Sequence, residues 1–155
     1  MRGFIGEMLG TFILSFLGCS SVAVSVLFGE YNSIFQIGLV WGIAVMLAVF
    51  LTRHICFAHL NPAVSVAMVV AGRMEAKMLP GYFAGQFLGA IMSGVMLYIL
   101  FGPSIAQYEL VHDIVRGSAA SVDTARMFGE FYPNPGDAIA TVSLPLAMLA
   151  GVLAP

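Results

Sequence analysis

The sequence predicts an all-α membrane protein with three membrane spans, a re-entrant half-helix and a partial fourth span. Of its 155 residues, 60% are hydrophobic and only 9% are charged, and the mean hydropathy is +0.97. A soluble domain has about 25% charged residues, so this composition excludes an ordinary soluble fold. The sequence contains no basic run that could bind a phosphate backbone, so nucleic acid is not expected as a partner. The partner that the composition predicts is the lipid bilayer.

Three apolar stretches are long enough to cross a hydrocarbon core of about 30 Å. The expected spans cover about residues 3–29, 34–52 and 79–101, and Glu7 is the one charged residue inside them. The first stretch is longer than the apolar part of a signal peptide and is followed at once by another span. It therefore reads as a true membrane helix.

The rest of the chain is expected to be a long external loop followed by a weaker apolar segment. Residues 1–101 form the first predicted unit and residues 102–136 form the loop. Residues 137–155 are apolar but contain Pro145, and a proline interrupts a helix. We expect them to form a partial or atypical fourth span.

Asn61-Pro62-Ala63 predicts the start of a helix that is too short to cross a membrane. Asn is a preferred N-cap residue, and Pro is favoured at the first helical position. The apolar run behind the motif ends at Gly72, so the helix over residues 61–72 would be on the order of 16 Å long. A half-helix that enters the bilayer N-terminus first is typical of transport proteins.

Basic residues in the loops predict the orientation. Four of them lie at one set of helix ends, namely Arg2, Arg53, Arg73 and Lys77, and two lie at the other, namely Arg116 and Arg126. The positive-inside rule places the first set, and with it the N-terminus, in the cytoplasm. The half-helix would then enter from the cytoplasmic side and return to it. We expect a multi-pass protein of a bacterial inner membrane or a plasma membrane.

Small residues predict where helices approach one another. Gly81, Gly85 and Gly89 recur every four residues, which gives a flat stripe for close helix packing. Cys19 and Cys56 both lie in apolar surroundings and are expected to be buried thiols rather than a disulfide or metal pair. No cofactor and no metal site is expected.

Three residues within or beside the spans carry candidate chemistry. Glu7 either faces lipid headgroups or accepts hydrogen bonds from irregular backbone at membrane depth. His59 either lines a pore or caps backbone groups before the half-helix. Trp41 lies several residues inside its span, away from the interfacial belt where Trp usually sits. It is either core packing or an aromatic pore wall.

Several blocks of the sequence resemble a known family. They are Gly6-Glu7-Met8-Leu9-Gly10-Thr11, Leu39-Val40-Trp41-Gly42, Phe57-Ala58-His59-Leu60-Asn61-Pro62-Ala63-Val64, Gln86-Phe87-Leu88-Gly89-Ala90, and the loop pieces from His112 to Ser118, from Ser121 to Asp123 and from Tyr132 to Pro135. In this order they resemble the N-terminal half of the major intrinsic protein (aquaporin) family, in its aquaglyceroporin branch. The resemblance covers roughly residues 3 to 135.

The resemblance implies a right-handed helical bundle, with an inverted repeat whose first copy is residues 1–101, assembled as a homotetramer. It implies a channel for passive transport of glycerol or similar small uncharged solutes and water. In that reading Asn61 donates its amide N–H to the solute, and Glu7 holds the loop. The backbone carbonyl groups of Phe57, Ala58 and His59 form a row of hydrogen-bond acceptors for water or hydroxyl groups. Trp41 forms the aromatic wall of the selectivity filter. Pro62 and Ala63 complete the cap of the half-helix.

Two departures from the family qualify these expectations. Phe57 stands where the family commonly has Gly. The family also has a second Asn-Pro-Ala motif, followed by the Arg of its selectivity filter, and this second motif does not occur in residues 1–155. The chain is therefore expected to hold half of a pore. A water-selective pore and a non-conducting truncated membrane subunit remain the alternatives. An enzyme is not expected, because no His-Glu-x-x-His or Gly-x-Ser-x-Gly pattern occurs in the sequence.

Overall fold

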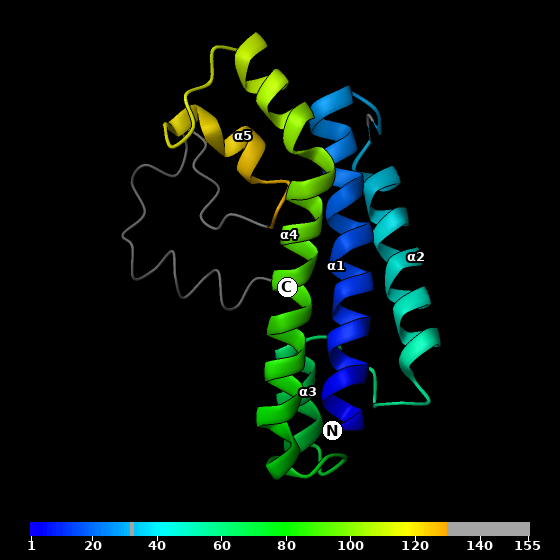
Figure 1. Ribbon diagram of the computed structural model, residues 1–155. Helices are drawn as coiled ribbons and strands as arrows, with labels where there is room; N and C mark the ends of the chain where they lie inside the picture. The colour runs from blue at the N-terminus through cyan, green and yellow to red at the C-terminus, as the bar shows by residue number, and fades with distance from the viewer. Residues whose placement is uncertain (32, 130–155) are drawn as a thin grey trace, which may run out of the picture.

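Helices make up all the regular structure of the part described by the computed structural model, residues 1–31 and 33–129 (Figure 1). Three are long: α1 (Arg2–Phe28), α2 (Ile34–Thr52) and α4 (Leu79–Val111). The shorter elements are α3 (Pro62–Val70), α5 (Val122–Ala125) and the 3-10 turns η1 (Ala76–Met78) and η2 (Ala119–Ser121). The expected fourth span, residues 137–155, lies outside the described residues.

The long helices have the length and the composition of membrane spans. α1, α2 and the continuous segment Ala76–Val111 each contain an apolar window long enough to cross a bilayer. Large apolar side chains on their outer surfaces are exposed, among them Phe35, Met46, Ile91 and Ile99. Exposed apolar faces of this extent suit contact with lipid rather than with water. The predicted all-α membrane fold is confirmed.

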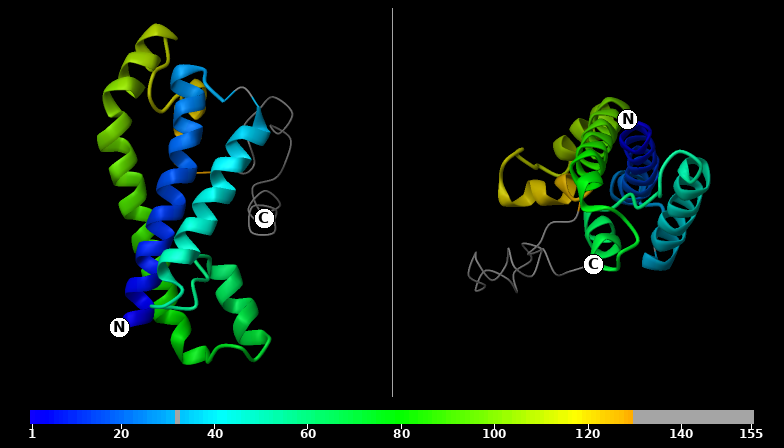
Figure 2. Two further views of the ribbon diagram at one scale, coloured as in Figure 1. Left: turned by 90° about the vertical axis from the view of Figure 1, so that its right-hand side faces the viewer. Right: turned by 90° about the horizontal axis from the view of Figure 1, so that it is seen from below.

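α1 lies between α4 and α2 and contacts both (Figures 1 and 2). On α4, a Cβ added at Gly85 would meet the Phe4 carbonyl oxygen at 2.5 Å, and one added at Gly89 would collide with the Met8 carbonyl oxygen. Glycine at these two positions therefore lets the two backbones touch. On the other side of α1, the contact with α2 uses alanines: Ala44 and Ala48 are fully buried.

The predicted glycine stripe differs from the structure at Gly81. A Cβ added there would meet no described atom within 4 Å, because the close crossing with α1 begins one turn later. The first turn of α4 instead contacts α1 through Tyr82, which lies against Gly3. Two glycines of α1 make room for a loop rather than for a helix: Gly6 lies against Cys56, and Gly10 lies against Leu60.

The ends of the helices follow local sequence signals, with one exception. Ser33 and Gln36 form a capping box at the start of α2. α4 continues to Val111, past residue 101 where the predicted span ends, with Pro103 inside it. The proline is tolerated because tertiary packing supports the helix on both sides of it. Ile105 is buried in a cluster with Ala23 and Met127.

Candidate functional site

The half-helix α3 begins where the Asn-Pro motif predicts. The Asn61 side-chain oxygen accepts a hydrogen bond from the Ala63 amide at 2.7 Å, and Pro62 occupies the first helical position. α3 has 9 residues, which gives a length of about 14 Å, less than half of a hydrocarbon core. It lies beside the first half of α4, at the end of the bundle where α1 begins (Figure 1).

The loop before α3 is held by Glu7, which is fully buried in α1. One carboxylate oxygen accepts from the His59 amide at 2.9 Å, and the other accepts from the Leu60 amide at 2.7 Å. The second oxygen also accepts from the Gln86 side-chain amide at 2.7 Å. Glu7 therefore joins α1, the loop and α4 at one point. Of the two roles predicted for Glu7, the contacts agree with that of an acceptor for irregular backbone.

The loop needs such support because two of its residues have left-handed backbone conformations. Ala58 has φ 51° and Leu60 has φ 54°, a region that costs about 1–2 kcal/mol for each non-glycine residue. This backbone conformation directs the N–H groups of four consecutive residues, 57–60, towards the interior of the protein. Phe57 donates to the Tyr82 hydroxyl at 3.2 Å, Ala58 donates to the Cys56 sulfur at 3.2 Å, and the next two donate to Glu7.

The same geometry leaves a set of polar groups without a protein partner. Within residues 1–31 and 33–129, the carbonyl oxygens of residues 57–60 accept no hydrogen bond. The side-chain amide N–H2 of Asn61, which is exposed, also makes no hydrogen bond there. The loop thus has a row of free acceptors that ends at a free donor. A solute with hydroxyl groups could exchange its water hydrogen bonds for this set.

Ser65 and Gln86 complete the network behind His59. The Ser65 hydroxyl oxygen accepts from the Gln86 amide at 3.0 Å, lies 3.2 Å from His59 Nδ1 and lies 3.2 Å from the Asn61 carbonyl oxygen. A hydroxyl has one proton, so if it donates to the carbonyl, Nδ1 must be the donor to Ser65. The imidazole is then fixed with Nε2 as a free acceptor, next to the Phe57 and Tyr82 rings. That His59 lines a pore stays a prediction.

Phe57 fits its position although the family commonly has Gly there. Its φ is not in the left-handed region, so a side chain at residue 57 causes no backbone strain. The ring packs at 6.4 Å from Tyr82, between ring centres, and is largely exposed.

Trp41 lies apart from this network, in a second region of the molecule. Its ring packs against Gly18 of α1, where an added Cβ would lie 2.5 Å from ring atoms. The ring also lines a cavity of about 580 Å³ near the end of α5, to which none of residues 57–63 contributes. Trp41 therefore packs against α1 and also borders a cavity. Its role as an aromatic pore wall stays a prediction.

A model of the family described as "Major intrinsic protein" matches residues 1–132. The chain belongs to the major intrinsic protein family. These are membrane channels, so the protein is an integral membrane protein with several spans. Glu7, residues 57–60 and the Asn61 cap all fall within the matched region.

Glycerol uptake facilitators are among the similar members of the family. The protein of that name from Pseudomonas aeruginosa is 32% identical over 149 residues, which are 96% of this chain and 53% of the relative. The one from Haemophilus influenzae is 38% identical over 131 residues, 84% of this chain and 49% of the relative. Aquaporin NIP1-2 of Arabidopsis thaliana is 34% identical over 128 residues, 83% of this chain and 44% of the relative. The chain spans about half the length of these curated relatives.

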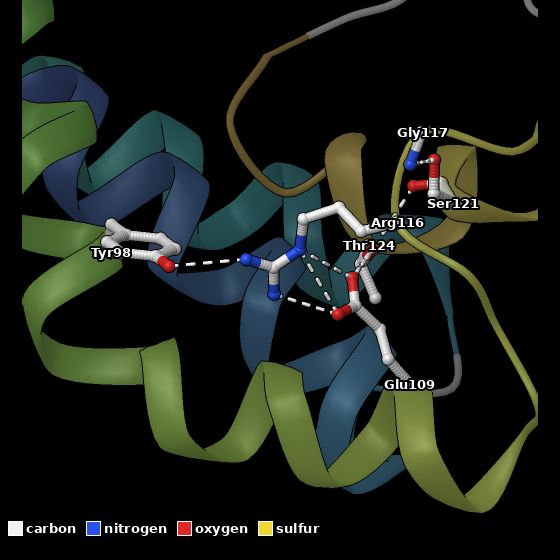
Figure 3. A network of polar contacts seen from close by, with 6 residues as sticks. All are labelled: Tyr98, Glu109, Arg116, Gly117, Ser121 and Thr124. Atoms are coloured by element: carbon white, nitrogen blue, oxygen red, sulfur yellow. Dashed lines mark hydrogen bonds and ion pairs between the residues drawn. The ribbon is translucent and has the colours of Figure 1, made fainter.

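In this major intrinsic protein, sequence reasoning missed a second polar network, which holds the segment after α4 (Figure 3). Glu109 is buried near the end of α4 and pairs with Arg116 at 2.8 Å. Its other oxygen accepts from the Thr124 hydroxyl of α5 at 2.9 Å, and Arg116 also donates to the Tyr98 hydroxyl at 3.2 Å. The hydrogen bonds from Arg116 to the Glu109 carboxylate raise the pKa of Arg116. This network fixes α5 against the last turns of α4.

Local signals for some of the missed residues do exist in the sequence. Gln86 is an amide inside an otherwise apolar span, and Ser65 is a hydroxyl inside an apolar half-helix. A polar residue in a membrane span is costly unless it has a partner. The sequence therefore indicates that each of these side chains faces a polar partner, but it does not identify that partner.

Proposed function

We propose that this protein forms the first half of a channel that conducts glycerol or similar small uncharged solutes, and water, down their gradients. The observation that carries the proposal is the loop before α3. Its four N–H groups donate inward, and its four carbonyl oxygens and the Asn61 amide are left without described partners. This is the arrangement a polyol needs, because each hydroxyl group must both donate and accept when it leaves water.

The exclusion of cations follows from the same elements. The N-terminus of α3 carries the positive end of a helix dipole, and Asn61 sits at that end. A cation that approached the free Asn61 amide would meet a partial positive charge in a low-dielectric setting. Glycerol and water carry no charge, so they bear no such penalty.

The apolar side of a polyol would lie against aromatic or aliphatic walls. Trp41 and the aliphatic side chains of its cavity supply such a surface. This favours a polyol over a strictly water-selective pore, which remains the second candidate because relatives named aquaporins are also similar. The names of the glycerol uptake facilitators support the same substrate class.

The conducting form in this proposal contains a second half of similar size, because the matched relatives are about twice as long as this chain. The second half would supply another half-helix facing Asn61. We further propose a cytoplasmic N-terminus, from the basic residues at the α3 end, and assembly as a homotetramer. A non-conducting membrane subunit is the alternative if no second half is present.

Stopped-flow light scattering on vesicles containing the full gene product tests the substrate. Glycerol and urea gradients are compared with a sucrose gradient, which reports water flow alone. We expect rapid reswelling in glycerol, at least several times faster than in empty vesicles. Fast shrinkage in sucrose without reswelling in glycerol would favour the water-selective pore. The 155-residue chain alone is expected to conduct neither.

A further inference from the structure

A pocket of about 410 Å³ opens at the end of the bundle where α1 begins and α2 ends. Its described lining comes from the start of α1, from residues 53–57 of the loop before α3, and from Met78 and Tyr82 at the start of α4. Figures 1 and 2 show these segments at one end of the molecule, together with α3. The charged residues of the described lining, Arg2 and Arg53, are both basic. The pocket is therefore a candidate site for an anion.

The guanidinium groups of these two arginines have most of their hydrogen-bonding capacity left over. Arg53 Nε donates to His54 Nε2 at 3.2 Å, and the Arg53 guanidinium lies over the Phe50 ring at 4.8 Å from the ring centre. Its four other N–H groups make no hydrogen bond with the described residues. The Arg2 guanidinium makes no hydrogen bond or ion pair with any described residue. Guanidinium N–H groups bind phosphate oxygens in pairs.

Among the described residues, two carboxylates lie at the same end of the bundle and reduce this positive charge only in part. Glu75 pairs with Lys77, and both side chains are exposed. Glu7 is fully buried and accepts hydrogen bonds from three donors of the loop and α4. Neither carboxylate lines the pocket. Since Lys77 balances the charge of Glu75, the two arginines oppose the single charge of Glu7, and the pocket remains net positive.

The length of α2 places the pocket at the surface of a bilayer. α2 has 19 residues, which corresponds to about 28 Å and so to one crossing of a hydrocarbon core of about 30 Å. Arg53 and His54 follow α2 directly and therefore lie at the level of the lipid headgroups. Beside them, Phe50, Leu51 and Ile55 are exposed. The site thus combines charges for a phosphate with an apolar surface for acyl chains, whereas a free phosphate ion would use only the charges.

We propose that this pocket binds the phosphate group of an anionic phospholipid. Arg2 and Arg53 donate hydrogen bonds to the phosphate oxygens, and the acyl chains lie along Phe50 and Ile55. Basic pockets between membrane helices bind anionic headgroups in this way. A lipid held here connects the start of α1 to the end of α2 through its phosphate group. The inference goes beyond the proposed function, because it holds whichever solute the pore conducts.

Native mass spectrometry of the full gene product tests the site. The protein is released from nanodiscs that hold equal amounts of phosphatidylglycerol and phosphatidylcholine with identical acyl chains, so that the two lipids differ only in the headgroup. An arginine at the membrane surface favours binding of an anionic lipid about fivefold. With two arginines in the pocket, we expect each chain to retain one phosphatidylglycerol in preference to phosphatidylcholine by roughly tenfold or more.

Two variants and a matched control separate the pocket from the general attraction of a basic surface. Arg2→Gln and Arg53→Gln should each lower the preference for phosphatidylglycerol roughly fivefold. Arg73→Gln removes the same charge at the same end of the bundle but outside the pocket, and should change the preference less than about twofold. All three arginines are exposed, and circular dichroism checks that the helix content of each variant is unchanged.

Three results would overturn the inference. An equal loss in Arg73→Gln would show attraction to the basic surface rather than to the pocket. An unchanged preference in both pocket variants would remove the arginines from the site. Displacement of the lipid by inorganic phosphate, compared with chloride at the same ionic strength, would assign the pocket to a free anion instead. None of these results depends on glycerol permeability, so the inference and the proposed function can fail separately.

Discussion

Replacing Glu7 by Gln perturbs a buried contact that joins α1, the loop before α3 and α4. The two side chains have the same shape, so the change removes the negative charge without leaving a cavity. A Gln side chain has one acceptor oxygen and one N–H2 group. Three donors point at the Glu7 carboxylate, namely the amides of His59 and Leu60 and the side chain of Gln86. At least one of them must then face another donor.

The structure sets the size of the effect. The lost hydrogen bond was made to a charged group and contributed about 1.5–3 kcal/mol. The remaining two become neutral and lose about half of their strength. Together these changes weaken the closed loop by roughly 3–5 kcal/mol. The left-handed conformations of Ala58 and Leu60 favour opening, so nothing local offsets the loss. At about 1.4 kcal/mol per tenfold change, the loop should open roughly 10²- to 10⁴-fold more often.

Hydrogen exchange measured by mass spectrometry follows this opening in a peptide that covers residues 57–63. We expect Glu7→Gln to remove most of its protection, while peptides from the middle of α4 keep theirs. Thr11→Val is the matched control, one turn further along α1. Thr11 is buried and its hydroxyl has no hydrogen-bond partner among the described residues, so the loop should be unaffected. Unchanged exchange of residues 57–63 in Glu7→Gln would refute the role assigned to the carboxylate.

Three further predictions concern contacts between helices. Gly89→Ala should destabilise the α1–α4 contact by about 1–3 kcal/mol, because its methyl group would collide with the backbone of α1. Gly81→Ala, where the methyl group meets no described atom, should not lower the thermal unfolding temperature in detergent. An equal loss of stability in both variants would contradict the close crossing of α1 and α4 at Gly89. Gly18→Ala should displace the Trp41 ring, which a shifted emission maximum would reveal and an identical spectrum would disprove. Thr124→Val should weaken the attachment of α5 to α4 by about 1–3 kcal/mol, because it removes a hydrogen bond to the buried Glu109 carboxylate. Limited proteolysis should then cut residues 117–129 faster, and wild-type resistance would argue against the anchor.

The parts of the site that depend on local chemistry could be predicted from the sequence. The Asn61 cap and the Pro at the first helical position mark the start of α3 without any tertiary information. The apolar lengths likewise predict α1 and α2 within a residue or two. The row of free carbonyl groups could be named only through the family resemblance, because it depends on the twist at Ala58 and Leu60.

The parts that depend on distant partners could not be predicted. Gln86 meets Glu7 across 79 positions of sequence, and Ser65 meets Gln86 across 21. No spacing rule connects such pairs before the helices are packed. Glu109 falls within the predicted loop, residues 102–136, because the predicted span ends at residue 101. The continuation of α4 to Val111 moves it onto a helix, where it faces Thr124 and Arg116.

The most direct test of the central claim is the glycerol permeability of vesicles that contain Asn61→Asp in the full gene product. Asp is as good an N-cap as Asn, so the bond to the Ala63 amide and the start of α3 are preserved. The free donor of residue 61 is replaced by a negatively charged acceptor. We expect glycerol reswelling to fall to the rate of empty vesicles while the helix content and the assembly stay unchanged. Wild-type permeability in this variant would contradict the claim that the Asn61 amide faces the solute.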